Sequence, residues 1–166
     1  MDPVPVYSHA PAGYECPFCL FLEGTEHATV GSRREDLVYC DDEVAAFVCL
    51  RQWPGTPGHV LVVPRAHWEN LFGLPLSLAV PMQRLVVRLA RAMKEAYGCD
   101  GVSTRQHNEP AGDQDVWHYH VHVFPRYSGD GLYGSTGRTM PAAERAAYAQ
   151  RLRRALERPR DSDACQ

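Results

Sequence analysis

The apolar positions of the chain fall into short runs in its first half. Runs at 36–39 and 43–50 are separated by Asp41 and Asp42, and this pattern predicts two strands joined in a hairpin. The run at 59–63 is apolar without alternation, and a proline follows it. A strand that is buried on both faces gives this pattern.

The second half combines two more predicted strands with two helices. The segments 101–106 and 116–124 have strand composition, and turn-forming residues at 108–112 join them. Between 77 and 97, apolar residues recur every three or four positions, which indicates an amphipathic helix. A shorter helix is expected at about 141–157. We therefore predict an α+β domain: an antiparallel sheet of about five strands, one long helix and a C-terminal helix.

Length and charge limit the possible classes of protein. The 166 residues, 45% hydrophobic and 22% charged, suit a single domain over 1–166 with loose ends at 1–14 and 159–166. The net charge of −3 gives no reason to expect binding to long nucleic acids. Without an apolar stretch of about 18 residues or a signal-like start, we expect no membrane partner and a cytoplasmic location. Six cysteines are too few for a disulfide scaffold.

Three histidines alternate along the predicted strand 116–124. His118, His120 and His122 would all point to one face of that strand. Packing explains such a row poorly, because histidine is a weak core residue, so a functional site is the better interpretation. A single zinc ion held by all three is unfavourable, since alternate side chains on a strand are about 6.5 to 7 Å apart.

Cys16 and Cys19 have the C-x-x-C spacing with which two thiolates grip one tetrahedral metal ion. On its own this spacing also fits a redox pair or an incidental pair of thiols. A redox role is weakly supported because no βαβ pattern follows the pair. A metal site would need two further ligands.

The run from His118 to Phe124, followed by Pro125 and Arg126, resembles the signature of the histidine triad (HIT) superfamily. Residues 54–67 resemble the upstream strand of that family, and Asn108, Gln114 and Asp115 lie in a segment that resembles its phosphate-binding loop. The resemblance covers roughly residues 16–126. It implies a HIT-like fold, a small nucleotide as substrate and a homodimer.

The resemblance also implies the roles of the histidines. In this family the middle histidine, here His120, attacks the α-phosphorus and forms a nucleotidyl-histidine intermediate. A neutral imidazole, with an ordinary pKa of about 6.5, is available for such an attack at pH 7 if a backbone carbonyl holds its other nitrogen. Donors must then face the phosphate, and the candidates are His122, His59, Gln114 and the backbone near Asp115. His59 resembles the auxiliary histidine of the family, although a surface histidine at a strand end remains the alternative.

In the zinc-containing branch of the family, two cysteines and two histidines bind the metal. His67 and His118 would complete such a set with Cys16 and Cys19. A site closed by four protein ligands is structural, because it leaves no position for a reacting water molecule.

Two positions depart from the family pattern. Arg51 stands eight residues before His59, where many relatives carry an aspartate or asparagine that holds the ribose, and a guanidinium cannot accept those hydrogen bonds, although it can pair with a phosphate. Asp115 replaces a hydroxyl residue, and it would either carry a proton or only cap its own turn. Trp53 is the candidate for stacking on a ligand.

The expected activity is a nucleotide hydrolase that cleaves a phosphoanhydride or phosphoramidate bond at the α-phosphate. A nucleotidyltransferase or phosphorylase with the same intermediate is the second hypothesis. A non-catalytic, zinc-stabilised nucleotide-binding protein is the third, and the residues at Arg51 and Asp115 are what favour it.

Overall fold

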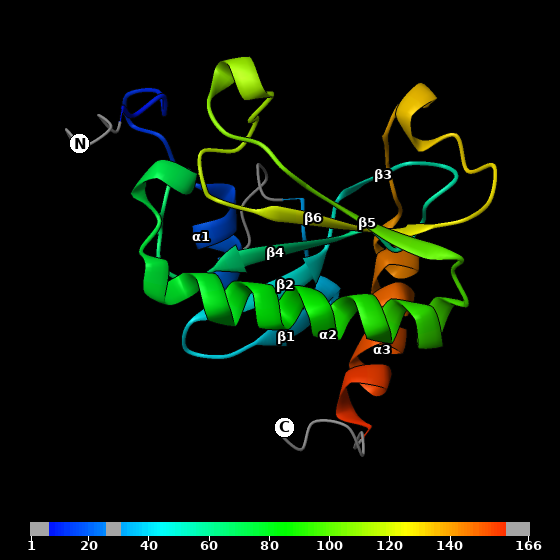
Figure 1. Cartoon of the computed structure of the whole chain (residues 1–166). Helices are drawn as coiled ribbons and strands as arrows, with labels where there is room; N and C mark the ends of the chain where they lie inside the picture. The colour runs from blue at the N-terminus through cyan, green and yellow to red at the C-terminus, as the bar shows by residue number, and fades with distance from the viewer. Residues whose placement is uncertain (1–6, 26–30, 159–166) are drawn as a thin grey trace.

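A five-stranded antiparallel sheet forms the centre of the computed structural model, which describes residues 7–25 and 31–158 (Figure 1). The strand order is β1-β2-β4-β6-β5. The strands are β1 (Leu37–Cys40), β2 (Val44–Val48), β4 (Val60–Pro64), β5 (Gly101–Gln106) and β6 (Val121–Arg126). Two short strands, β3 (Arg51–Gln52) and β7 (Arg138–Thr139), pair separately. The predicted α+β class and the antiparallel sheet of about five strands are confirmed.

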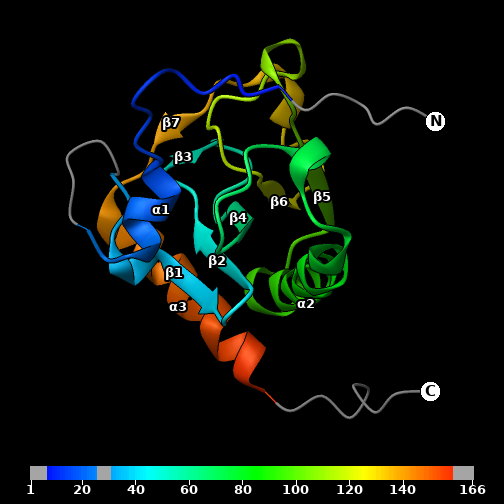
Figure 2. The same ribbon diagram turned by 90° about the vertical axis from the view of Figure 1, so that its left-hand side faces the viewer.

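Three helices cover the sheet: α1 (Pro17–Leu22), α2 (Ala79–Tyr97) and α3 (Ala142–Glu157). Figure 2 shows α2 nearly end-on, together with α3, on one side of the sheet and α1 on the other. The long amphipathic helix begins two residues later than predicted, because 76–78 form a 3-10 turn. It ends at Gly98, whose φ of 66° is the left-handed conformation that favours glycine after a helix.

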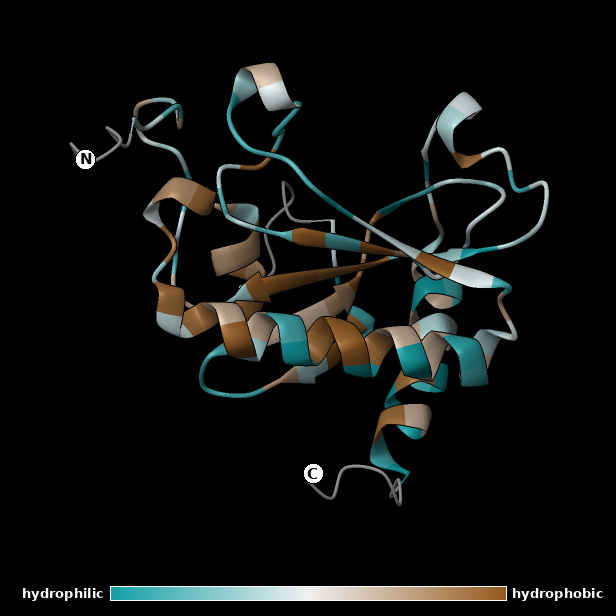
Figure 3. Ribbon diagram, viewed as in Figure 1, coloured by the Kyte–Doolittle hydropathy of each residue, from teal (hydrophilic) through white to brown (hydrophobic). Residues whose placement is uncertain are grey.

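Strand β4 is buried along its whole length, as its unbroken apolar run predicts. Its even-numbered valines pack against α2 and α3, whereas Leu61 and Val63 pack against α1. In Figure 3 this strand is hydrophobic throughout, while β5 and β6 mix polar and apolar residues. The half of the sheet formed by β5 and β6 is therefore where polar side chains can gather.

The predicted strand 116–124 is wrong at both ends, because β6 spans Val121–Arg126. Before Val121 these backbone groups make no ladder with a strand: His118 donates its N–H to the Val116 carbonyl two residues earlier, and Tyr119 donates its N–H to the Trp68 carbonyl in the loop after β4. His118 and His120 thus lie in an irregular segment. Strand alternation therefore places only His122, because it is the one histidine of the three that lies in β6. The positions of His118 and His120 are set by the irregular segment.

Two features were not predicted, the helix α1 inside the C-x-x-C segment and the small β3–β7 sheet. The described part of the N-terminal arm, residues 7–14, has no helix or strand, but Ser8 and His9 are hydrogen-bonded to Glu69. Residues 1–6 and the tail 159–166 lie outside the described part of the chain. No helix in the described ranges is long and apolar enough to cross a membrane.

Candidate active site and metal site

Four histidines converge on the face of the sheet opposite α2. His122 on β6 pairs with Leu61 on β4, and His59 immediately precedes β4, so the two imidazoles become neighbours with ring centroids 5.1 Å apart. His120 lies next to His122, at 4.9 Å between rings. His59 and His118 are fully buried, and His120 is 2% exposed.

The tautomer of His120 is fixed by the backbone. Its Nδ1–H donates to the His118 carbonyl at 2.7 Å, which leaves the Nε2 lone pair free. Burial lowers the pKa of His120, against the opposing effects of that hydrogen bond and of Asp115. The Asp115 carboxylate lies 4.0 Å from Nε2 and is largely exposed. His120 is therefore a neutral imidazole whose free nitrogen faces the Asp115 side.

His59 and His122 form a hydrogen-bonded pair. The Nδ1 of His59 lies 3.4 Å from the Arg51 carbonyl, and its Nε2 lies 3.0 Å from the Nδ1 of His122. Burial lowers the pKa of His59 to about 3, and burial followed by the nearby His59 strongly lowers that of His122. With both rings neutral, His59 donates to the carbonyl and His122 donates to His59. The Nε2 of His122 is then an acceptor, although it was expected to donate to a phosphate.

Gln52 holds His59 in place, which the sequence did not reveal. Its side-chain oxygen accepts from the backbone N–H groups of Gly58 and His59, and its nitrogen donates to the His59 carbonyl. Gly58 has a φ of 91°, and a Cβ there would meet Tyr97 at 2.7 Å. The conformation of the loop before β4 is therefore fixed by the buried side-chain amide of Gln52 and by Gly58, a position that only glycine fits.

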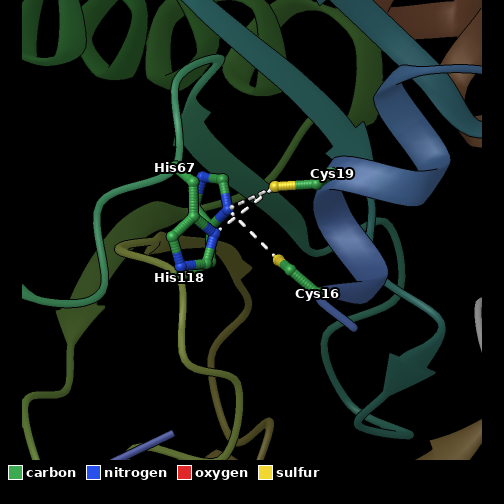
Figure 4. Close-up of side chains that lie close together, drawn as sticks. All are labelled: Cys16, Cys19, His67 and His118. Atoms are coloured by element: carbon green, nitrogen blue, oxygen red, sulfur yellow. Dashed lines mark hydrogen bonds between the residues drawn. The ribbon is translucent and has the colours of Figure 1, made fainter. Parts of the chain in front are cut away.

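A second cluster, formed by Cys16, Cys19, His67 and His118, lies beside the histidines (Figure 4). Both thiols come from the N-terminal end of α1 and face the two imidazoles. The ligand atoms all lie within 4.8 Å of one another, with Cys16 Sγ 3.3 Å and Cys19 Sγ 3.6 Å from His118 Nδ1. A tetrahedral zinc site with ordinary bond lengths separates its ligands by about 3.3 to 3.8 Å. The four side chains are thus close to zinc-binding geometry.

The proton positions in this cluster also suit a metal. His118 donates Nε2–H to the Pro64 carbonyl at 2.9 Å, so its Nδ1 lone pair faces the thiols. Burial lowers the pKa of His118 to about 4. Burial, and then the nearby Cys16, raise the pKa of the Cys19 thiol to about 12. A bound cation would reverse that shift, because it stabilises thiolates. The donor set therefore fits zinc.

The side-chain amides of Asn108 and Gln114, which were predicted to contact substrate, form hydrogen bonds within the protein. Gln114 donates to the carbonyls of Glu69 and Val116, and its oxygen accepts from the backbone of Glu109. The oxygen of Asn108 accepts from the backbone N–H of Leu71. In this structure both side chains fix the loop and direct no free donor toward His120.

The other predicted substrate contacts lie at different distances from the histidines. Arg51 donates to the Gly137 carbonyl, and only its backbone carbonyl reaches His59. Trp53 packs edge-on against His59 with ring centroids 5.6 Å apart. Asp115 alone of these residues places a charged group near the His120 nitrogen.

Three residues near the histidines were not singled out from the sequence. Phe18, between the two cysteines, packs edge-on against His120 with ring centroids 5.4 Å apart. His107 lies 5.6 Å from the His122 ring, and Arg105 lies opposite His122 on the neighbouring strand. Alternation along 101–106 could have placed Arg105 on the histidine face, but the sequence did not show which strand was adjacent to β6.

Comparison with known proteins agrees with the resemblance. The family model of the HIT domain matches residues 31–129. The chain is 35% identical to Protein hit of Bacillus subtilis over 75% of this chain and 79% of that protein. It is 28% identical to adenylylsulfatase HINT3 of Arabidopsis thaliana, over 73% of this chain and 57% of that protein.

A solved structure of a zinc-bound histidine triad family protein from Mycobacterium smegmatis matches the fold with a TM-score of 0.70. The two sequences are 32% identical, and the match covers 85% of this chain and 92% of that one. The domain match spans more than half of the chain, and the sheet, the long helix and the histidine cluster accompany it. This chain therefore belongs to the HIT family, a superfamily of nucleotide-binding proteins and hydrolases.

Proposed function

We propose that the chain is a nucleotide hydrolase that cleaves a phosphoanhydride or phosphoramidate bond at the α-phosphate, with His120 as the covalent nucleophile. The observation that carries the proposal is the hydrogen bond from His120 Nδ1 to the His118 carbonyl, at 2.7 Å. A nucleophilic imidazole needs one nitrogen fixed as a donor and the other unprotonated. Membership of the HIT family, which includes the adenylylsulfatase HINT3, supports the reaction class.

The reaction would proceed in two displacements. First, the Nε2 lone pair of His120 bonds to the α-phosphorus, and the bond from phosphorus to the leaving oxygen or nitrogen breaks. The leaving group departs with the electron pair and, where it is an amine, takes up a proton from solvent. Second, a water oxygen bonds to phosphorus, the nitrogen–phosphorus bond breaks, its electron pair returns to Nε2, and the water proton passes to solvent. Dividing one difficult displacement into two easier ones is the advantage of covalent catalysis.

We further propose that Cys16, Cys19, His67 and His118 hold a structural zinc ion. Zinc bound there would fix α1 against the segment that carries His120, and it would keep His118 neutral. The donor geometry supports this, as does the zinc-bound relative from Mycobacterium smegmatis. The contribution of this metal site to catalysis would be positional, because the carbonyl of a fixed His118 orients His120.

Trapping the intermediate tests the proposed nucleophile. The protein is mixed with adenosine phosphoramidate or diadenosine tetraphosphate, quenched within the first turnovers and digested for mass spectrometry. We expect an adenylyl group on the peptide that contains His120, and none in His120→Ala. His9→Ala, in a surface histidine of the arm, is the matched control and should keep the adduct. Turnover by His120→Ala at the wild-type rate would refute the proposal.

Two further readouts separate the alternatives. A nucleotidyltransferase or phosphorylase would give a product that depends on added phosphate or another acceptor, whereas the hydrolase needs only water. Tight nucleotide binding with no adduct and no turnover would instead indicate a non-catalytic nucleotide-binding protein.

A further inference from the structure

Arg105 lies on the histidine face of the sheet, next to the proposed site of attack. Strand β5 pairs with β6 so that Arg105 is directly opposite His122. Residues that pair directly across two antiparallel strands project from the same face. His59, which immediately precedes β4, lies on the other side of His122. A phosphate held above His122 would therefore have His59 on one side and Arg105 on the other.

The guanidinium of Arg105 has no polar partner among the described residues. Its Nε is buried without a hydrogen-bond acceptor. Instead, its central carbon lies 4.6 Å from the ring centroid of Phe124, 5.6 Å from that of Trp53 and 5.5 Å from that of Tyr133. Rings attract the cation, but they do not satisfy its five in-plane donors. The aromatic rings thus hold the side chain in place, while its N–H groups remain available to donate hydrogen bonds to a ligand.

Neighbouring arginines differ from Arg105 in this respect. Arg126 also contacts Tyr133, but it forms a two-point ion pair with the carboxylate of Asp130. Arg51 donates to the Gly137 carbonyl. Of these three arginines, Arg105 is therefore the one whose guanidinium is left to pair with an incoming anion.

An anionic nucleotide bound at the histidines would need a positive charge nearby. The rings of His59 and His122 are neutral at pH 7, and Asp115 adds a negative charge near His120. A nucleotide brings further negative charge. One face of the Phe124 ring stacks against His59 with ring centroids 4.0 Å apart, and Arg105 also contacts Phe124. A permanent positive charge is therefore separated from the neutral imidazole of His59 by a single aromatic ring.

We propose that Arg105 binds an anionic leaving group on the β5 side of the α-phosphate and so favours phosphoanhydride substrates over phosphoramidates. The inference rests on the proposed nucleotide function. In a phosphoanhydride the leaving group is itself a phosphate, which a guanidinium fork binds through two hydrogen bonds. The leaving amine of a phosphoramidate offers it no charge to bind. Trp53 and Tyr133 are the walls of this subsite.

Binding measurements test the inference without requiring turnover. The full-length protein and its variants are titrated in a calorimeter with AMP and with α,β-methylene-ADP, a non-cleavable analogue that adds one phosphate. Charge-assisted hydrogen bonds contribute about 1.5 to 3 kcal/mol, so Arg105→Gln should weaken binding of the analogue by roughly 10- to 100-fold. AMP should change by less than about threefold, which long-range charge alone explains.

Two variants complete the experiment. Arg105→Lys keeps the charge but loses the fork, and it should show an intermediate loss for the analogue alone. Arg88→Gln removes an arginine that also stacks on a ring, that of Tyr39 at 4.8 Å, on helix α2 far from the histidines. It should bind both nucleotides as the wild type does.

The outcomes separate this inference from the proposed function. If the wild type binds AMP and the analogue equally, or if Arg105→Gln weakens both equally, Arg105 is no leaving-group residue, while the nucleotide function stands. An equal loss for both ligands would identify the aromatic walls as a base-stacking site that Arg105 merely supports. If the wild type binds neither ligand, the nucleotide function fails and the inference fails with it.

Discussion

The two ends of the histidine row use the same side chain in opposite ways. His118 donates its Nε2–H to the Pro64 carbonyl and turns the Nδ1 lone pair toward the two thiols. His122 donates from Nδ1 to His59 and leaves Nε2 free. Both are neutral through burial. The partner of one ring nitrogen, which comes from a distant segment, therefore decides which of the two nitrogens of a buried imidazole keeps its lone pair.

His120 lies between these two ends and depends on the metal end. Its Nδ1 is held by the carbonyl of His118, whose own ring belongs to the Cys2His2 cluster. A change in the cluster can therefore reach His120, the proposed nucleophile, through one peptide group. A substitution at the metal end, followed by a measurement of the reaction rate, tests this dependence.

Loss of a metal ligand should have the largest effect. In Cys19→Ser we expect the zinc content to fall from one per chain to near zero. The melting temperature should drop by about 10 °C, corresponding to roughly 3 to 5 kcal/mol. Because His118 would no longer be fixed, kcat/KM should also fall by roughly 10- to 100-fold, as for other supporting contacts of metal ligands. Elemental analysis, thermal melts and kinetics provide the three readouts.

Cys40→Ser is the matched control, because Cys40 is a free, exposed thiol at the end of β1. It should leave zinc content, melting temperature and rate unchanged. Full zinc occupancy in Cys19→Ser would contradict the assignment of the cluster. An unaltered rate in a zinc-free variant would disprove the coupling through His118.

Acid should destabilise the fold through the buried histidines. The pKa of His59 is lowered to about 3 in the folded chain, whereas in the unfolded chain it is about 6.5. Below pH 6.5 the unfolded chain therefore binds protons that the folded chain does not. The free energy of unfolding should decrease as the pH falls from about 6.5 toward 4, by roughly 1 kcal/mol per pH unit for this residue.

Urea unfolding at several pH values measures this slope. His59→Gln should show a shallower slope than the wild type. A slope that is identical in His59→Gln and the wild type would show that folding does not lower the pKa of His59.

The smallest effect is expected from the carboxylate beside the nucleophile. Asp115 acts to raise the pKa of His120, so Asp115→Asn should lower that pKa further. The acidic limb of the kcat/KM profile should then move to lower pH. Asp113→Asn is the control, because Asp113 already has the left-handed conformation that asparagine tolerates. A shift toward higher pH in Asp115→Asn would rule out this interaction.

The parts of the fold that depend on local pattern were predictable from the sequence. The strand 101–106 was placed correctly, and the apolar run at 59–63 gave a strand displaced by one residue. The predicted strand 116–124 failed because hydrogen bonds within the segment and to the loop after β4 replaced the ladder before Val121. Such bonds depend on the tertiary arrangement, which periodicity does not contain.

The candidate site shows the same division. The cluster of Cys16, Cys19, His67 and His118 has the composition that the family resemblance implied, and the structure brings the four together. Arg105 and Gln52 were missed, since their importance lies in what they face and not in any spacing. Sequence motifs located the reacting groups, whereas the groups that orient them or balance their charge became visible only in the fold.

The separation of the cluster's members along the chain sets the order of events during synthesis. Cys16 and His118 are 102 positions apart, although their side chains touch. A ribosome adds about 5 to 20 residues per second, so roughly 5 to 20 s pass between the first thiol and the last imidazole. The helix α1 must wait for most of the domain before its binding partners exist. Metal capture at the proposed site would then have to follow the synthesis of His118, and His120, two residues later, would be oriented only after that point.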